Sequence, residues 1–155
     1  MQTRRRQVLQ WGAAGWLLAA SPGARGGVSV APGTSTAWPQ ALFQATSLQQ
    51  IAHGLGLRLR PSDAVQVTGP DIAEIGAAVP VGVECPTPGV DLLGLAVPRN
   101  PVALAGLFEL EADALPQVDT RIKMARSSHV YGLARSGGTL LYARKLIKVT
   151  VGGCG

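Results

Sequence analysis

Alternation of apolar and polar residues with a period of two is the dominant pattern in the second half of the chain. It is clearest at Val79–Val83 and Val118–Met124, where apolar side chains recur at every second or nearly every second position. Such alternation is typical of strands with one buried face. Leu92–Val97 is instead almost entirely apolar, as expected for a central strand.

The remaining strands are expected at Val65–Thr68, Phe108–Glu111, His129–Arg135 and Leu140–Val151. The last two flank Gly137-Gly138, a pair that accepts the positive φ of a tight hairpin turn. Seven strands at this spacing indicate an all-β fold, an immunoglobulin-like antiparallel β-sandwich, with a barrel as the alternative. We place this domain at residues 36–151.

One helix is expected before the strands, at Thr36–His53. Its helical period is imperfect, but Thr36 suits an N-cap and Pro39 is tolerated in a first turn. Gly54 and Gly56 are expected to end the element.

Residues 1–31 have the pattern of an export signal. Arg4-Arg5-Arg6 precedes a ten-residue apolar run, Trp11–Ala20, which is too short to span a bilayer stably. Arg5–Leu9 resembles the twin-arginine export pattern, with an ordinary Sec signal as the alternative. Ser29-Val30-Ala31 fits a cleavage site. We therefore expect a twin-arginine signal peptide and a periplasmic protein without a membrane anchor.

The basic net charge of +5 belongs largely to this leader. Four of the fourteen Lys and Arg residues precede residue 32, so ten remain to balance nine Asp and Glu residues. The rest of the chain has no basic stripe with interleaved aromatic residues, and we expect no nucleic-acid partner.

The last four residues, Gly152-Gly153-Cys154-Gly155, follow the final strand and contain no side chain larger than a thiol. Glycine ranges freely over φ and ψ and has no side chain to pack, so we predict a flexible arm. Four extended residues reach roughly 13–14 Å. The pattern favours an arm that presents Cys154 to narrow clefts in other proteins, with an incidental or disulfide-bonded cysteine as the alternatives.

Other chemistry-bearing residues are mostly explained by structure or solvation. Cys85 is in phase with the alternating valines before it and is expected to face the core, although a Cys85–Cys154 bridge stays open in an exported protein. His53 and His129 lack metal-ligand spacing, and no metal site is expected. No spacing singles out an acid–base pair among Asp71, Glu74 and Glu84. The charges of one outer strand face, Asp119, Arg121 and Lys123, suit solvent or a partner.

Several stretches resemble the SoxY family, the sulfur-carrier subunit of the thiosulfate-oxidising Sox system. Gly69–Val81 resembles the family's P-x-IAE-x-G-x-x-VPV region, and Lys148–Gly155 is similar to its KVTxGGCGG terminus, with the single Gly155 after the cysteine. Asn100-Pro101, Phe108–Leu110 and Thr120–Ala125 also look like the family. The resemblance covers about residues 40–155.

This resemblance implies a carrier rather than an enzyme. It implies an immunoglobulin-like body paired with a SoxZ-like subunit, and Cys154 as the covalent attachment site. The haem enzyme SoxXA would join thiosulfate sulfur to the thiol, SoxB would release sulfate, and a sulfane dehydrogenase would oxidise the sulfur left behind. No cofactor is expected apart from the sulfur intermediates bound covalently to Cys154.

Two other functions remain from the residues alone. One is a non-catalytic envelope immunoglobulin-like binding module in which Cys154 is structural or incidental. The other is a thiol-based redox enzyme, which the absence of a CxxC motif or nearby resolving cysteine disfavours.

Overall fold

The computed structural model describes residues 38–151, which form two short helical elements and nine strands. The helical elements are the 3₁₀-helix η1 (Gln40–Gln44) and the α-helix α1 (Leu48–Gly54). The strands are β1 (Arg58–Pro61), β2 (Gln66–Thr68), β3 (Ile72–Ile75), β4 (Val79–Glu84), β5 (Val90–Ala96), β6 (Leu104–Glu109), β7 (Gln117–Ile122), β8 (Ser128–Ser136) and β9 (Thr139–Val151). The expected signal peptide lies outside the described residues. Within residues 38–151, no helix has the length and apolar character needed to cross a membrane.

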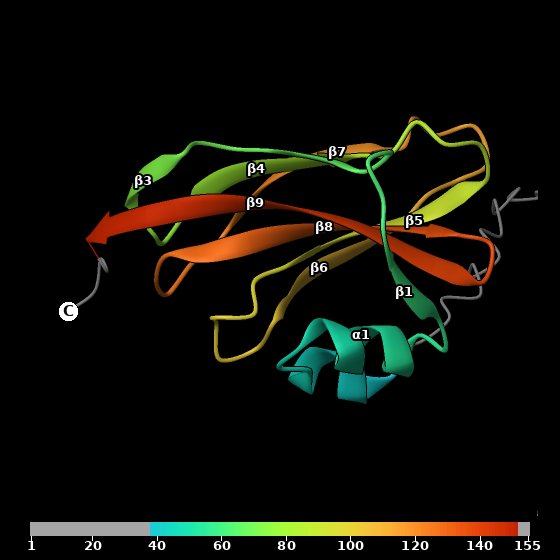
Figure 1. Ribbon diagram of the computed structural model, residues 1–155, viewed down its shortest axis with the longest axis horizontal. Coiled ribbons are helices and arrows are strands. Elements are labelled where there is room, and N and C mark those ends of the chain that lie inside the picture. Colours follow the sequence, from blue (N-terminus) through green and yellow to red (C-terminus); the bar gives the residue numbers. More distant parts are fainter. Residues whose placement is uncertain (1–37, 152–155) are drawn as a thin grey trace, which may run out of the picture. The chain divides into compact units, whose positions relative to one another are not determined.

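The strands form two sheets that face each other as a sandwich (Figure 1). The first sheet has the order β1-β9-β8-β5-β6, with β3 added along the end of β9, and the second has the order β2-β4-β7. The predicted β-sandwich is confirmed. The prediction of seven antiparallel strands missed β1 and β3, which both run parallel to β9. These strands have four residues each, too few for a recognisable alternation.

The core between the two sheets follows the predicted alternation. Val79, Val81 and Val83 of β4 are buried and belong to one apolar cluster with Ile147 of β9. The sheets approach closely at Gly132 of β8, where an added Cβ would lie 2.7 Å from a methyl group of β2. Because two heavy atoms cannot sit that close, this position accepts only glycine without movement of the opposite sheet.

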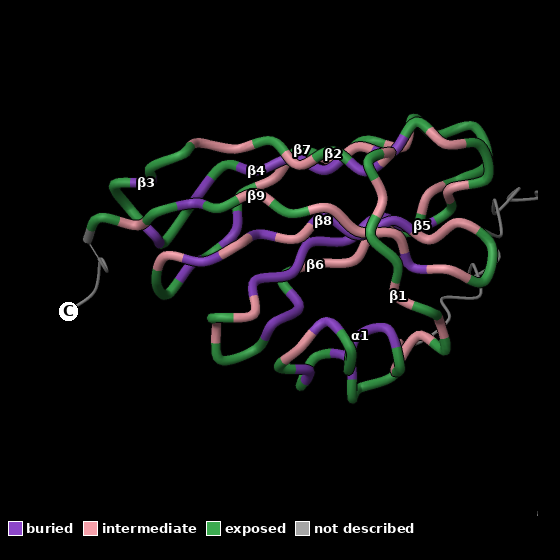
Figure 2. Tube along the Cα trace, viewed as in Figure 1, coloured by how far each residue is buried: buried purple, intermediate pink, exposed green. Residues whose placement is uncertain are grey.

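The predicted central strand is confirmed, because residues 92–96 of β5 are all buried, which places them under cover on both faces of the sheet (Figure 2). Leu93 and Leu95 point into the core between the sheets. Ala96 instead belongs to a second cluster with Leu42 of η1 and Ile51 of α1. The helical elements therefore form a third layer over part of the outer face of the first sheet, and this layer explains why residues 92–96 of β5 include no polar side chain.

The prediction of one helix over Thr36–His53 is wrong, because the helical region breaks between η1 and α1. Ala45 is extended, and its carbonyl accepts a hydrogen bond of 2.7 Å from the amide of Ala103. Ser47 then caps α1, since its hydroxyl accepts a hydrogen bond of 3.3 Å from the amide of Gln50. A tertiary hydrogen bond and a local cap together outweigh continuous helix formation.

Two predicted glycine turns are confirmed. Gly56, just beyond α1, has a φ of 68°, the left-handed conformation that commonly closes a helix. Gly137 has a φ of 56° in the hairpin between β8 and β9, where Ser136 pairs with Thr139 across a two-residue turn.

Adjacent residues on β9 test this arrangement. We expect Ile147→Ala to lower the free energy of unfolding by about 2–5 kcal/mol, because the side chain is fully buried between the sheets. Leu146→Ala is the matched control, because Leu146 faces outward and is 47% exposed; its effect should stay near about 0.5 kcal/mol. Denaturant unfolding measures both. Equal losses would contradict the register of β9.

Candidate functional site

The residues predicted to carry the chemistry, Gly152, Gly153, Cys154 and Gly155, lie outside the described residues. The structure does describe the part of the body to which they are joined. Strand β9 ends at Val151, at one end of the sandwich (Figure 1). The geometry around the last residues of β9 therefore determines where the tail begins and which surfaces surround it.

Strand β3 pairs with the final residues of β9, beyond the point at which the pairing of β9 with β8 stops. The pairing of β8 with β9 stops at Ile147. From there β3 pairs in parallel, with Ala73 opposite Val149 and Ile75 opposite Val151. The amide of Lys148 also donates a hydrogen bond of 2.9 Å to the carbonyl of Asp71. β9 is therefore paired with a neighbouring strand along its whole length, first with β8 and then, on its opposite edge, with β3.

A serine side chain takes the place of the missing β8 partner on the other edge of β9. The hydroxyl of Ser127 accepts a hydrogen bond of 2.9 Å from the amide of Val149 and lies 3.4 Å from the carbonyl oxygen of the same residue, to which it can donate. Ser127 is half-buried, so these bonds are partly shielded from water. Val149 is therefore held from both edges, two residues before the strand ends.

An exposed ion pair adds a weak link between β9 and the segment before β3. The ammonium of Lys145 lies 2.7 Å from Oδ1 of Asp71, whose side chain is 87% exposed. The hydrogen bond from Lys145 and its positive charge lower the pKa of Asp71. The pair therefore supports folding above the unfolded-state pKa of Asp71, and this support is lost as the pH falls through the lowered folded-state pKa. Solvent screening keeps the contribution small.

Gly76, which follows β3, lies too close to neighbouring atoms to accept a larger residue. An added Cβ would collide with the carbonyl oxygen of Met124 and lie 3.1 Å from Cγ1 of Val149. The amide of Met124 donates a hydrogen bond of 2.7 Å to the carbonyl of Gly76. Buried Ala73 completes the contact of β3 with the core. These small residues let β3 lie close to the sandwich beside the end of β9.

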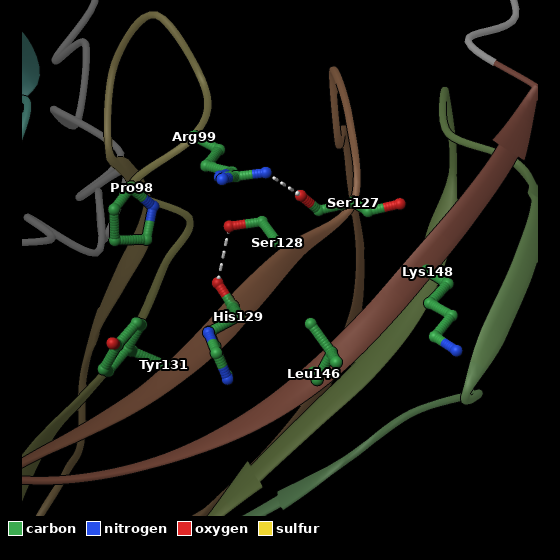
Figure 3. Close-up of a pocket in the computed structure, with 8 residues that line it drawn as sticks. All are labelled: Pro98, Arg99, Ser127, Ser128, His129, Tyr131, Leu146 and Lys148. Atoms are coloured by element: carbon green, nitrogen blue, oxygen red, sulfur yellow. Dashed lines mark hydrogen bonds between the residues drawn. The ribbon is translucent and has the colours of Figure 1, made fainter.

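An open pocket of about 560 Å³ lies on the outer face of β8 and β9, next to this end. Figure 3 shows His129 and Leu146 side by side on the two strands, with Lys148 further along β9 and Arg99 on the facing loop. The remaining lining residues are Pro98, Ser127, Ser128 and Tyr131. The sequence pattern had not distinguished this surface, because its residues come from three separate segments.

The two histidines and the other predicted polar residues are not brought together. His53 is exposed at the end of α1, and His129 is half-buried with its ring 6.2 Å from that of Tyr131. Both roles agree with the predicted structural or solvated histidines. No group of three His, Cys, Asp or Glu residues within 38–151 is arranged to hold a metal ion. The outward charges of β7 and its continuation, Asp119, Arg121 and Lys123, are exposed.

Cys85 faces the core as predicted and is completely buried. Its thiol lies 3.5 Å from the hydroxyl of Thr87, and it is a free cysteine. Its amide bonds to the carbonyl of Pro116, just before β7 begins. The end of β9 lies instead beside Met124, just past the end of β7. The length of β7 therefore separates Cys85 from the end of β9 by about 20 Å.

Comparisons with known proteins agree on one family. The family model described as "Sulfur oxidation protein SoxY" matches residues 53–154. Among solved structures, the sulfur carrier protein SoxY from Chlorobium limicola f thiosulfatophilum is similar, with 33% sequence identity and a TM-score of 0.60. That match covers 66% of this chain and 94% of the other. No curated protein matches the chain.

Substitution of Gly76 tests how the end of β9 is held. We expect Gly76→Ala to lower the free energy of unfolding by about 1–3 kcal/mol, because the Met124 backbone must move to admit a methyl group. Amide exchange at Val149 should also accelerate. Gly138→Ala is the matched control, since an added Cβ there meets open space. A Gly76→Ala protein as stable as this control would contradict the close contact.

Proposed function

The chain belongs to the SoxY family of sulfur oxidation proteins, and from this membership we propose that it carries sulfur intermediates covalently on Cys154. One observation carries the proposal: the family match runs through Cys154, and this cysteine lies three residues beyond a strand held along both edges. In this proposal the folded body supports the terminal residues, and the terminal residues enter the active sites of other proteins.

The proposed chemistry begins with oxidative attachment of thiosulfate. The Cys154 thiolate and the outer sulfur of thiosulfate form a disulfide-type bond, and two electrons pass to the haem enzyme SoxXA. SoxB then hydrolyses the terminal sulfone and releases sulfate, which leaves one sulfur atom on the cysteine for a sulfane dehydrogenase. A cysteine without activating neighbours is mostly protonated at neutral pH, which suits a carrier whose partner enzymes supply the activation.

Glycine on both sides of Cys154 supports transfer between enzymes. Without a Cβ, Gly152, Gly153 and Gly155 add no side chain to the backbone, so the thiol can enter a channel little wider than an extended chain. The carrier needs no resident cofactor, because its cargo is bound as covalent sulfur. In this role it is the substrate of its partner enzymes rather than a catalyst.

The position of Cys85 opposes the disulfide alternative. Cys154 is the third residue after Val151, so the chain from Val151 to Cys154 spans about 11 Å at most. The length of β7, about 20 Å, separates the end of β9 from Cys85, which is also fully buried. These distances oppose a Cys85–Cys154 bridge and so support a Cys154 that is available for cargo.

Family membership implies a SoxZ-type partner subunit. We further propose export to the periplasm by the twin-arginine pathway, because Arg5-Arg6 precedes a short apolar run in residues 1–31. SoxXA, SoxB and a sulfane dehydrogenase are the proposed transient partners.

Intact-mass spectrometry of the protein from thiosulfate-grown cells tests the attachment site. We expect thiosulfonate or sulfane adducts that disappear in Cys154→Ser and persist in Cys85→Ala. A thiol reagent should label Cys154 in the native protein and Cys85 only after denaturation, because Cys85 is fully buried. Adducts that survive Cys154→Ser would refute the proposal, and the non-catalytic binding module would then be the better interpretation.

A bulky residue in the arm tests passage through enzyme channels. We expect Gly153→Val to slow thiosulfate-dependent turnover with purified SoxXA and SoxB by at least about tenfold, because misfit near the reacting group carries a large rate penalty. The unfolding midpoint should not change, since residue 153 lies beyond the last strand. Unaltered turnover would show that the channels do not require a bare arm.

A further inference from the structure

The helical layer leaves part of the first sheet uncovered, and this part leads to the end of β9. Leu133 and Leu140 lie beneath η1 and α1 in one buried cluster. Further along the same outer face, the pairs Tyr131–Arg144 and His129–Leu146 lie opposite each other on β8 and β9. Tyr131 still packs against that cluster, whereas Arg144 is exposed and Leu146 is 47% exposed. Lys148 continues this row toward Val151.

We name this surface the β8–β9 outer face and define it by Arg99, His129, Tyr131, Arg144, Leu146 and Lys148. Three of these residues are arginine or lysine, and the residues lining its pocket include no carboxylate (Figure 3). The two ion pairs found within residues 38–151 use Arg135 and Lys145 instead. The face therefore combines unpaired positive charge with one exposed leucine and a half-buried aromatic ring.

The shortness of the arm places this face against any enzyme that encloses Cys154. From Val151 to Cys154 the chain spans about 11 Å at most, so the mouth of the enzyme must reach the body around the end of β9. Lys148 lies three residues before Val151, about 10 Å back along the strand. The β8–β9 outer face thus lies within the footprint of an enzyme that takes in the thiol.

We propose that the β8–β9 outer face is the docking surface for the enzymes that act on the Cys154 adduct. The matching surface on such an enzyme is the entrance of its active-site channel, where Asp and Glu residues surround an apolar patch. This inference rests on the proposed carrier function. Permanent subunit interfaces are usually larger and more apolar, whereas exposed cations mainly raise the association rate and set partner choice. A second copy of the chain would bring like charges together, which opposes self-association through this face.

Steady-state hydrolysis by a purified SoxB-type enzyme tests the proposal. The full-length carrier, in complex with its partner subunit, is loaded with tetrathionate: the Cys154 thiolate displaces thiosulfate and gains the thiosulfonate group, which needs no enzyme. Sulfate release is then measured against carrier concentration. We expect Lys148→Glu and Arg99→Glu each to lower kcat/KM about tenfold with kcat unchanged. The decrease of kcat/KM with rising salt concentration should also be weaker in these variants.

Arg60→Glu on β1 is the matched control, because it reverses an exposed charge far along β9 from Val151. Loading by tetrathionate should be equal in all variants. This measurement reports the reactivity of the Cys154 thiol separately from docking. Equal kcat/KM for Lys148→Glu, Arg99→Glu and Arg60→Glu would overturn the docking inference while leaving the carrier function intact. Loss of the partner subunit or a changed oligomeric state in Lys148→Glu would overturn it too. Absence of hydrolysis with the wild-type adduct would refute the proposed function and this inference together.

Discussion

The backbone hydrogen bonding of β9 is the constraint on which the rest of the structure depends. This strand has thirteen residues, more than twice the usual strand length. It pairs with β1 at its start, with β8 over most of its length and with β3 at its end. Because one continuous strand supplies all three pairings, the hairpin, the sheet edge and the attachment point of the terminal residues form one rigid unit.

The two faces of the first sheet have different tasks as a consequence. Its inner face packs against the second sheet, closely enough at Gly132 that an added methyl group would collide with Val67 and Val83. Its outer face is covered by η1 and α1 over only part of its length. The uncovered part carries exposed Leu146 and Lys148 beside the end of β9. A partly covered sheet thus leaves a distinct surface next to the terminal residues.

The proposed carrier function divides the molecule into a rigid body and a short terminal segment. Ser127 and β3 hold Val149 on both edges, so β9 is hydrogen-bonded to the body almost to its last residue. A longer terminal segment would sample a larger volume and lower the effective concentration of the thiol at an enzyme docked on the body. A short terminal segment requires the enzyme to approach the body closely. In this proposal the charged side chains near the end of β9 therefore lie close enough to the enzyme to affect its binding.

Sequence alone determined the strands whose signal is local. Alternation at β4 and β7, the apolar run of β5, the glycine hairpin and the inward direction of Cys85 all follow from which face of a strand a residue occupies, and a period of two records this directly. The carrier chemistry proposed for the Gly-Gly-Cys-Gly terminus also comes from the sequence, and it stays a prediction because these residues lie outside the described part of the chain. Only the tertiary structure decided the break after η1, because the carbonyl of Ala45 finds its partner at Ala103, far along the chain. The same holds for β1 and β3, whose parallel pairing depends on the distant β9, and for the charged outer face, which gathers residues from separate loops and strands.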